Sequence, residues 1–195
     1  ALPDLHGHPQ PSAAFGLVHG DAARTVPLIA AFQHLIYNAD VLTDEDRRKI
    51  EQDFLGKTMR EIQLYERFIS AQNNHQTWFN GGHAAVGVAI GDKELLRAAV
   101  YDPKRGLMWQ LGHSITADGL WYEGTIAYHF YALQAILETV EAARRVGWVI
   151  KDPRLKRMFL GPIQLAYPNG QFPAINDGDR ASLRGYRRFY RWAFE

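Results

Sequence analysis

The stretch NNHQTWF (residues 73–79) combines residue types that are suited to binding a sugar rather than to filling a core. It places two neutral amides and an imidazole directly before a threonine and two aromatic rings. An amide can donate a hydrogen bond to an anion, and an imidazole can exchange a proton near neutral pH. The pair Asn74–His75 is therefore predicted to contact an acidic group of a bound sugar, with Trp78 nearby.

Two further stretches carry polar and aromatic residues at the predicted ends of helices or in loops, where binding residues concentrate. In DGLWYEGTIAYHFYAL (118–133), Tyr128 and Tyr131 are three residues apart and share one helix face. Gly124 is predicted to lie one turn before Tyr128 and to leave space in front of it. Glu123 is expected at the helix start, where the dipole favours a carboxylate. The third stretch, PNGQFPAINDGD (168–179), is turn-rich and too polar for a core.

Composition limits the classes of function that fit the chain. Its 195 residues suffice for one domain, and 47% hydrophobic residues suffice for a core. The net charge of +1 comes from 22 basic and 21 acidic residues, without the basic stripe of a nucleic-acid-binding protein. No cysteine is present, and no apolar run approaches the roughly 20 residues of a membrane helix. We therefore expect no nucleic-acid partner and no membrane span.

The histidines do not show the short His-x₃-His or His-x-His spacing of a helical or strand metal site. They include His75, His83, His113 and His129. Neither a metal site nor a cofactor is predicted.

Apolar periodicity predicts an all-α fold in which helical hairpins pack side by side. Expected helices lie at 24–38, from 44 to about 70, at 76–90, 93–102, 125–147, 154–161 and in the last ten residues. Helix-start signals support this prediction at Thr43 with Asp46, at Asp92 and at Asp152-Pro153. In the second helix, Phe54 and Phe68 are placed on the apolar side. No alternating run indicates a strand.

NNHQTW, followed some fifty residues later by DGLWYEG…YHFYAL, resembles the (α/α)-toroid polysaccharide lyases. The similarity is to heparinase II/III-like proteins and related alginate lyases, and PNGQFPAINDGD resembles a loop of the heparinase II/III-like group. The resemblance to these lyases covers about residues 60–180. The resemblance implies an incomplete toroid of antiparallel helical hairpins. Residues 1–195 would form a single α-helical domain of a longer bacterial lyase, periplasmic or secreted, whose C-terminal β-sandwich is absent.

The resemblance also implies a reaction, which is β-elimination on an acidic polysaccharide that contains uronic acid. Asn74 and His75 would bind the uronate carboxylate, and Tyr128 would act as base and then as acid. Whether Tyr128 or His75 takes the proton would depend on the C5 epimer. Further residues are expected to bind substrate: Trp78, Trp121, Tyr122, Glu123, His129, Tyr131, Asn176 and Asp177.

Other interpretations remain open on the residues alone. A toroid glycoside hydrolase would need two carboxylates, which Asp118 or Glu123 together with Asp177 could supply. A non-catalytic carbohydrate-binding module is the third class. Asn74 could simply cap a helix, and Trp78 and Trp121 could fill the core instead of stacking on sugars.

Overall fold

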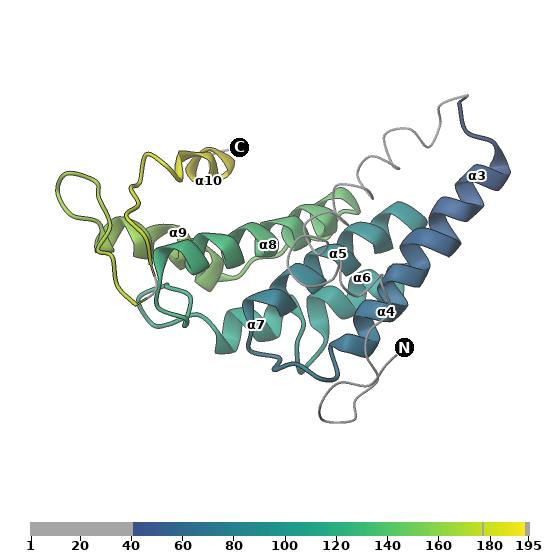
Figure 1. Cartoon of the computed structure of the whole chain (residues 1–195), viewed down its shortest axis with the longest axis horizontal. Coiled ribbons are helices and arrows are strands. Elements are labelled where there is room, and N and C mark those ends of the chain that lie inside the picture. The colour runs from purple at the N-terminus through teal and green to yellow at the C-terminus, as the bar shows by residue number, and fades with distance from the viewer. Residues whose placement is uncertain (1–40, 177, 194–195) are drawn as a thin grey trace.

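The computed structural model describes residues 41–176 and 178–193, and within these ranges the chain is helical. Figure 1 shows long helices lying side by side, with the C-terminal segment folded back over one end. The helices are α3 (Asp44–Arg48), η1 (Lys49–Gly56), α4 (Lys57–Tyr65), α5 (Asn74–Ile90), α6 (Lys93–Tyr101), α7 (Leu107–His113), α8 (Ile126–Arg145), α9 (Pro153–Leu165) and α10 (Arg187–Trp192). In the described ranges extended pairing is limited to two isolated bridges. The all-α prediction is confirmed, and toroidal closure stays a prediction.

The first described helical segment, from α3 to α4, confirms its predicted start and corrects its predicted faces. Thr43 and Asp46 form a reciprocal capping box, as expected. The segment ends at Tyr65 rather than near residue 70. Phe54 and Phe68 are 45% and 63% exposed, so their predicted place on the buried side is wrong. Phe54 lies in the π-helical segment η1, whose wider turns break the 3.6-residue periodicity, and Phe68 lies beyond the helix end.

Helices α5 and α6 form an antiparallel hairpin, and the predicted helix-start residue Asp92 lies in its turn. Gly91 ends α5 in the left-handed conformation, with φ 73°. Asp92 then accepts hydrogen bonds from the backbone N–H groups of Glu94 and Leu95 and caps α6. A Cβ on Gly87 would lie 2.9 Å from Leu96 N, so only glycine allows this close approach. The hairpin fixes the direction of α5, which carries NNHQTWF at its start.

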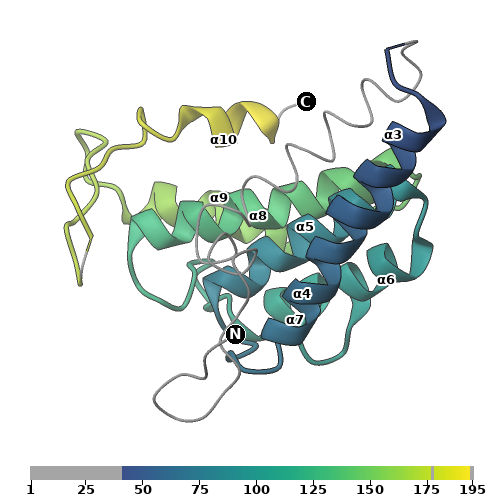
Figure 2. The same ribbon diagram turned by 45° about the vertical axis from the view of Figure 1, so that its right-hand side comes forward.

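Helix α8 runs parallel to α5 and beside it (Figures 1 and 2). Asn74, at the first residue of α5, contacts Glu123 just before α8. One to two turns further along, an added Cβ on Gly81 would lie 3.3 Å from Ala135 O. Because the contacts advance along both helices together, the N-termini of α5 and α8 lie at the same end. This parallel arrangement determines where the site forms.

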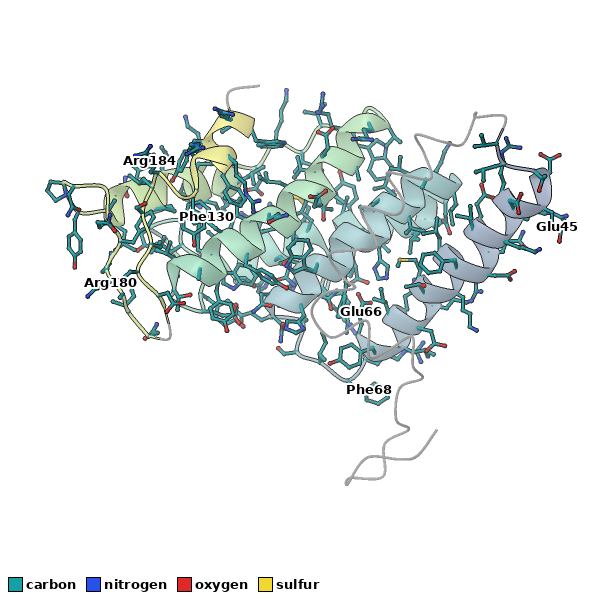
Figure 3. All side chains as sticks on the ribbon, turned by 45° about the horizontal axis from the view of Figure 1, so that its top comes forward. Glu45, Glu66, Phe68, Phe130, Arg180 and Arg184 are labelled. Atoms are coloured by element: carbon teal, nitrogen blue, oxygen red, sulfur yellow. The ribbon has the colours of Figure 1, made fainter. Side chains whose placement is uncertain are left out.

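The loop and helix after α9 are held over α8 by an aromatic cluster around Phe130 (Figure 3). Phe130 stacks on Tyr186 with a centroid distance of 3.9 Å, and Phe189 lies 5.0 Å away. Phe172, in the third sequence stretch, belongs to the same buried cluster. The cluster therefore brings residues 168–176 toward the start of α8.

Helix α7 was not predicted from the sequence, which indicated no helix between residues 102 and 125. The helix expected at 24–38 lies outside the described residues. Among the helices that the structure describes, none is both long enough and apolar enough to cross a membrane.

Candidate functional site

A pocket of about 240 Å³ opens at the paired N-termini of α5 and α8. Its lining residues are Asn74, His75, Ala127, Tyr128 and Tyr131. All three predicted catalytic residues, Asn74, His75 and Tyr128, thus face one cavity although they come from two helices. Tyr128 is 37% exposed and Asn74 only 5%, so the phenol stands at the opening and the amide lies in the wall.

Both helices that end at the pocket are capped by side chains. Asn73 accepts a hydrogen bond from the His75 backbone N–H at 2.7 Å. Thr125 accepts one from the Tyr128 backbone N–H at 3.0 Å. The capping role that Asn74 could have played therefore belongs to Asn73, and the Asn74 side chain is directed elsewhere. Two helix N-termini, each with a partial positive charge, converge on a pocket whose lining carries no acidic side chain.

Glu123 holds the Asn74 amide in one orientation. Asn74 Nδ2 donates to Glu123 Oε1 at 3.0 Å and to Oε2 at 2.9 Å. Trp121 Nε1 donates to the same carboxylate at 2.5 Å. Because an ionised carboxylate only accepts hydrogen bonds, it fixes Nδ2, rather than Oδ1, on its side. Glu123 precedes the N-cap Thr125 by two residues, so it lies just before the helix start at which it was expected.

The two tryptophans predicted to bind sugars are buried. Trp78 is 2% exposed and Trp121 is 1% exposed, so neither ring has a face open to a sugar, and the stacking prediction is wrong for both. Their burial reflects the close α5–α8 packing, which encloses large rings that sequence patterns cannot place. Trp78 instead packs against Tyr131, with a centroid distance of 5.1 Å, and so supports a residue of the pocket wall.

His129 is fully buried and is likewise unavailable to a substrate. Its Nδ1 accepts from the Trp121 backbone N–H at 3.1 Å, and its Nε2 donates to Met158 O at 2.9 Å. Burial lowers the pKa of His129 to about 4, although the hydrogen bond to Met158 opposes the shift. The imidazole is therefore neutral at physiological pH and joins the loop before α8 to α9. The predicted substrate-binding role of His129 is wrong.

Tyr122 and Asn176 border the pocket region. Tyr122 is 39% exposed, and its hydroxyl donates to Gln72 O at 2.7 Å. Burial, and secondarily the neighbouring Glu123, raises the pKa of Tyr122. Asn176 donates from Nδ2 to Gly124 O at 3.0 Å, which brings the third stretch to the second. Gly124 lies outside the helix at φ 76°, and Asn176 occupies the space that Gly124 was predicted to leave open.

Asp177, the last predicted binding residue, lies outside the described residues. The histidine spacing predicted no metal site, and in the described part of the chain no three His, Cys, Asp or Glu side chains gather as metal ligands.

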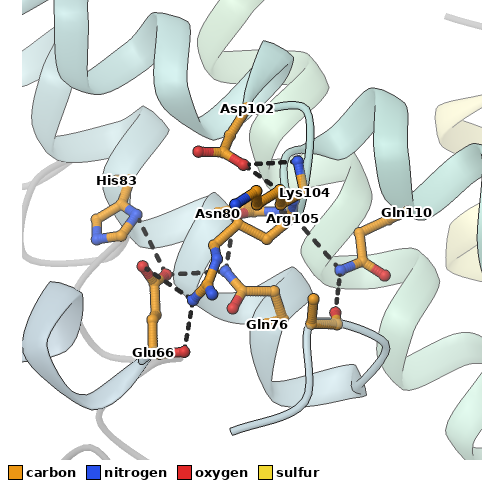
Figure 4. Close-up of polar contacts among 9 residues, drawn as sticks. Glu66, Gln76, Asn80, His83, Asp102, Lys104, Arg105 and Gln110 are labelled. Carbon is orange, nitrogen blue, oxygen red and sulfur yellow. Dashed lines mark hydrogen bonds and ion pairs between the residues drawn. The ribbon is translucent and has the colours of Figure 1, made fainter. Parts of the chain in front are cut away.

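A buried polar network behind the pocket was missed by the sequence analysis (Figure 4). Glu66, 6% exposed, accepts from Gln76 Nε2 at 2.8 Å, and Arg105 Nη1 donates to Glu66 O at 2.5 Å. Asn80 Nδ2 donates to Arg105 O at 2.8 Å. The network ties the end of α4 and the loop after α6 to α5. Its sequence signal is the polar stripe Gln76, Asn80 and His83 on a helix of otherwise small and apolar residues.

His83 completes this network. Its Nδ1 lies 3.6 Å from Glu66 Oε1, within ion-pair distance but too long for a hydrogen bond. Burial lowers the pKa of His83, and Glu66 partly opposes this. His83 faces the network rather than the pocket, so it supports α5 from behind.

Together, these features define an all-α protein whose pocket combines an amide, an imidazole and a phenol. Comparison with family models matches the Alginate lyase family over residues 8–158. The match covers most of the chain, so the protein belongs to the alginate lyase family, as the sequence motifs predicted. Membership supports polysaccharide lyase activity. Comparison with curated proteins finds no match.

Proposed function

We propose that this protein cleaves a uronic-acid polysaccharide, with alginate as the first candidate, by β-elimination at the α5–α8 pocket. The observation that carries the proposal is the single pocket shared by Asn74, His75 and Tyr128. Family membership independently supports a polysaccharide substrate.

The first task of such a site is to stabilise the charge that forms when the proton next to the uronate carboxylate is removed. The Asn74 amide donates hydrogen bonds without adding a charge, and Glu123 holds it in place. His75, in its protonated form, adds a donor and a positive charge. The N-termini of α5 and α8 favour an anion at the same position. The Asn74 amide, the His75 imidazole and the two helix N-termini together would bind the carboxylate more strongly as negative charge develops.

The second task is proton transfer. The C5 proton passes to deprotonated Tyr128 while the C4–C5 double bond forms and the C4–O4 bond breaks. The leaving O4 then takes a proton from the Tyr128 hydroxyl. Tyr128 thereby returns to its deprotonated starting state, and no co-reactant is needed. His75 is the alternative base for the opposite C5 epimer, because it lines the same pocket.

The pocket lining favours elimination over hydrolysis. A glycoside hydrolase needs two carboxyl groups on opposite sides of the bond that is cleaved. None of the five lining residues is acidic, and Glu123 is bonded to Asn74 and Trp121. Asp118 is hydrogen-bonded within its own turn, to Thr116. The lining also contains no Lys or Arg to meet sulfate groups, which favours alginate over heavily sulfated polymers.

The experiment is ultraviolet absorbance during incubation with alginate, heparin, chondroitin, hyaluronan and glucuronan, since elimination creates an absorbing unsaturated uronate. Replacing Tyr128 by Phe should abolish the absorbance rise and leave the thermal unfolding temperature nearly unchanged. Tyr101→Phe is the matched control, because Tyr101 is also exposed but packs on Trp148 beyond the far end of α8. Near-normal turnover by Tyr128→Phe would remove Tyr128 from the mechanism. New reducing ends without absorbance would instead indicate hydrolysis.

A further inference from the structure

We propose that Tyr122 and the stacked pair Trp109–His113 form a second sugar-binding subsite, which holds a uronate unit next to the one in the pocket. The proposal rests on the proposed function for the identity of the ligand, a chain of uronate units. We call these three residues the aromatic subsite.

Short hydrogen bonds place the aromatic subsite beside the pocket wall. Tyr122 directly precedes Glu123, which is bonded to Asn74. The Tyr122 hydroxyl donates to Gln72 O, two residues before Asn74. Gln72 Nε2 in turn donates to His113 O at 2.7 Å. A single hydrogen bond therefore joins His113 to the segment that leads into Asn74.

Tyr122 and His113 are exposed, Trp109 is half-buried, and all three rings are held in place. Tyr122 is fixed at both ends, by its hydroxyl on Gln72 O and by its backbone N–H on Ser114 O at 3.0 Å. Trp121 backs the Tyr122 ring at a centroid distance of 5.3 Å, so the exposed 39% of Tyr122 faces away from the core. Rings that are ordered before binding lose little conformational entropy when a ligand stacks on them.

The Trp109–His113 pair is ordered in the same way on the last turns of α7. The two rings stack at 4.3 Å with an angle of 10° between their planes. His113 Nδ1 lies 2.9 Å from Trp109 O, and since a carbonyl only accepts, Nδ1 carries the hydrogen. His113 is exposed, and its other ring nitrogen has no hydrogen bond to the described residues. That nitrogen can accept from a sugar hydroxyl or, when protonated, donate to a uronate carboxylate.

This combination fits an acidic sugar better than an apolar ligand. The ring faces provide flat apolar surfaces for the C–H side of a pyranose, and the His113 nitrogen provides one polar contact at the edge. Tyr122 and His113 are both hydrogen-bonded to Gln72, two residues before Asn74, so the occupant we propose is a neighbouring unit of the same polymer rather than a separate molecule.

The test compares Tyr122→Leu and Trp109→Leu with the control Tyr101→Leu, each placed in a Tyr128→Phe background so that bound oligomers stay intact. Binding of the uronate monomer and of alginate-derived oligomers of two to six units is measured by calorimetry. Tyr101 packs on Trp148 and belongs to neither the pocket nor the aromatic subsite, so it serves as the control. Circular dichroism confirms that each variant is folded, and His113→Ala provides a milder change should Trp109→Leu fail to fold.

The expected result is a five- to tenfold weaker binding of every oligomer of two or more units by the aromatic-subsite variants, with binding of the monomer and binding by the Tyr101 control unchanged. A tenfold loss corresponds to about 1.4 kcal/mol. Equal losses at every length, the monomer included, or no loss, would overturn the subsite. Turnover by the protein with native Tyr128 is measured separately. If it cleaves no polymer while binding still shows the length-dependent loss, the lyase proposal fails and the subsite stands.

Discussion

Replacing Asn74 by Asp tests whether Glu123 orients the catalytic amide. The change keeps the shape of the side chain but puts a carboxylate oxygen where Nδ2 now lies, 2.9–3.0 Å from both Glu123 oxygens. Two unit charges about 4 Å apart repel by about 4 kcal/mol at an effective dielectric constant near 20. Glu123 is only half-buried, so solvent makes this an upper value.

Protonation of the new carboxyl group in Asn74→Asp sets a similar upper limit on the loss of unfolding free energy. A carboxyl group with an ordinary pKa of about 4 can be kept protonated at pH 7 for about 4 kcal/mol, since each pH unit corresponds to 1.36 kcal/mol. The loss of stability in Asn74→Asp should therefore be largest near pH 7. It should vanish near pH 4, where the added carboxyl group takes up a proton in the unfolded state too. A protonated Asp can again donate to Glu123.

The assay is urea unfolding of the original protein, Asn74→Asp, and the double variant Asn74→Asp/Glu123→Gln at pH 4.5 and pH 7. The double variant exchanges acid and amide across the same contact, so it should recover most of the stability at pH 7. It should not recover turnover, because its carboxylate now faces the pocket and repels the substrate. Asn169→Asp is the control, since that side chain only accepts a hydrogen bond, from the backbone N–H of Gln171, and an Asp keeps it.

Two outcomes would refute the reasoning. Asn74→Asp could lose no more stability at pH 7 than at pH 4.5 relative to the original protein, which would mean that Glu123 does not face Asn74. The double variant could also be fully active, which would mean that the amide at position 74 is not needed for catalysis.

Two other predictions follow from single contacts. His129 should contribute roughly 3 kcal/mol of stability above pH 6.5 that is lost between pH 6.5 and pH 4, because its pKa is about 4 when folded and near 6.5 when unfolded. Urea unfolding at several pH values measures this loss of stability. The variant His129→Gln should lack the loss, whereas the control His113→Gln should keep it. Gly124→Ala should cost more than the 1–2 kcal/mol of a left-handed alanine, because its Cβ would lie 2.6 Å from Asn176 Nδ2. Gly91→Ala, also at positive φ but with nothing within 4 Å, supplies the baseline in thermal unfolding and should leave turnover unchanged.

Local sequence signals predicted most of the helix boundaries because caps act through neighbouring residues. The capping box at Thr43, the cap at Asp92 and the left-handed Gly91 each depend on contacts within a few positions. The π-helical segment η1 was missed because its wider turn departs from the periodicity on which the prediction rested. Helix α7 was missed because seven residues offer too few turns to show a period.

The candidate site was predictable in part for a different reason. Asn74, His75 and Tyr128 were chosen from the resemblance, and no local rule would have joined residues some fifty positions apart. Glu123 was named from the sequence, but its contact with Asn74 spans 49 positions and could not be derived. The tryptophans were placed wrongly because an indole suits a sugar face and a core equally well, and only the packing of α5 on α8 decides between them.

The parallel course of α5 and α8 explains why a pocket forms at this end and why its lining can do without Lys or Arg. Antiparallel neighbours would set a negative helix C-terminus beside each N-terminus and cancel much of the field. Here both N-termini point the same way, and Asn73 and Thr125 satisfy one donor at each. A substrate carboxylate would therefore find part of its compensating charge in the backbone, beside the side chains of Asn74, His75 and Tyr128 that we propose act on the reacting atoms.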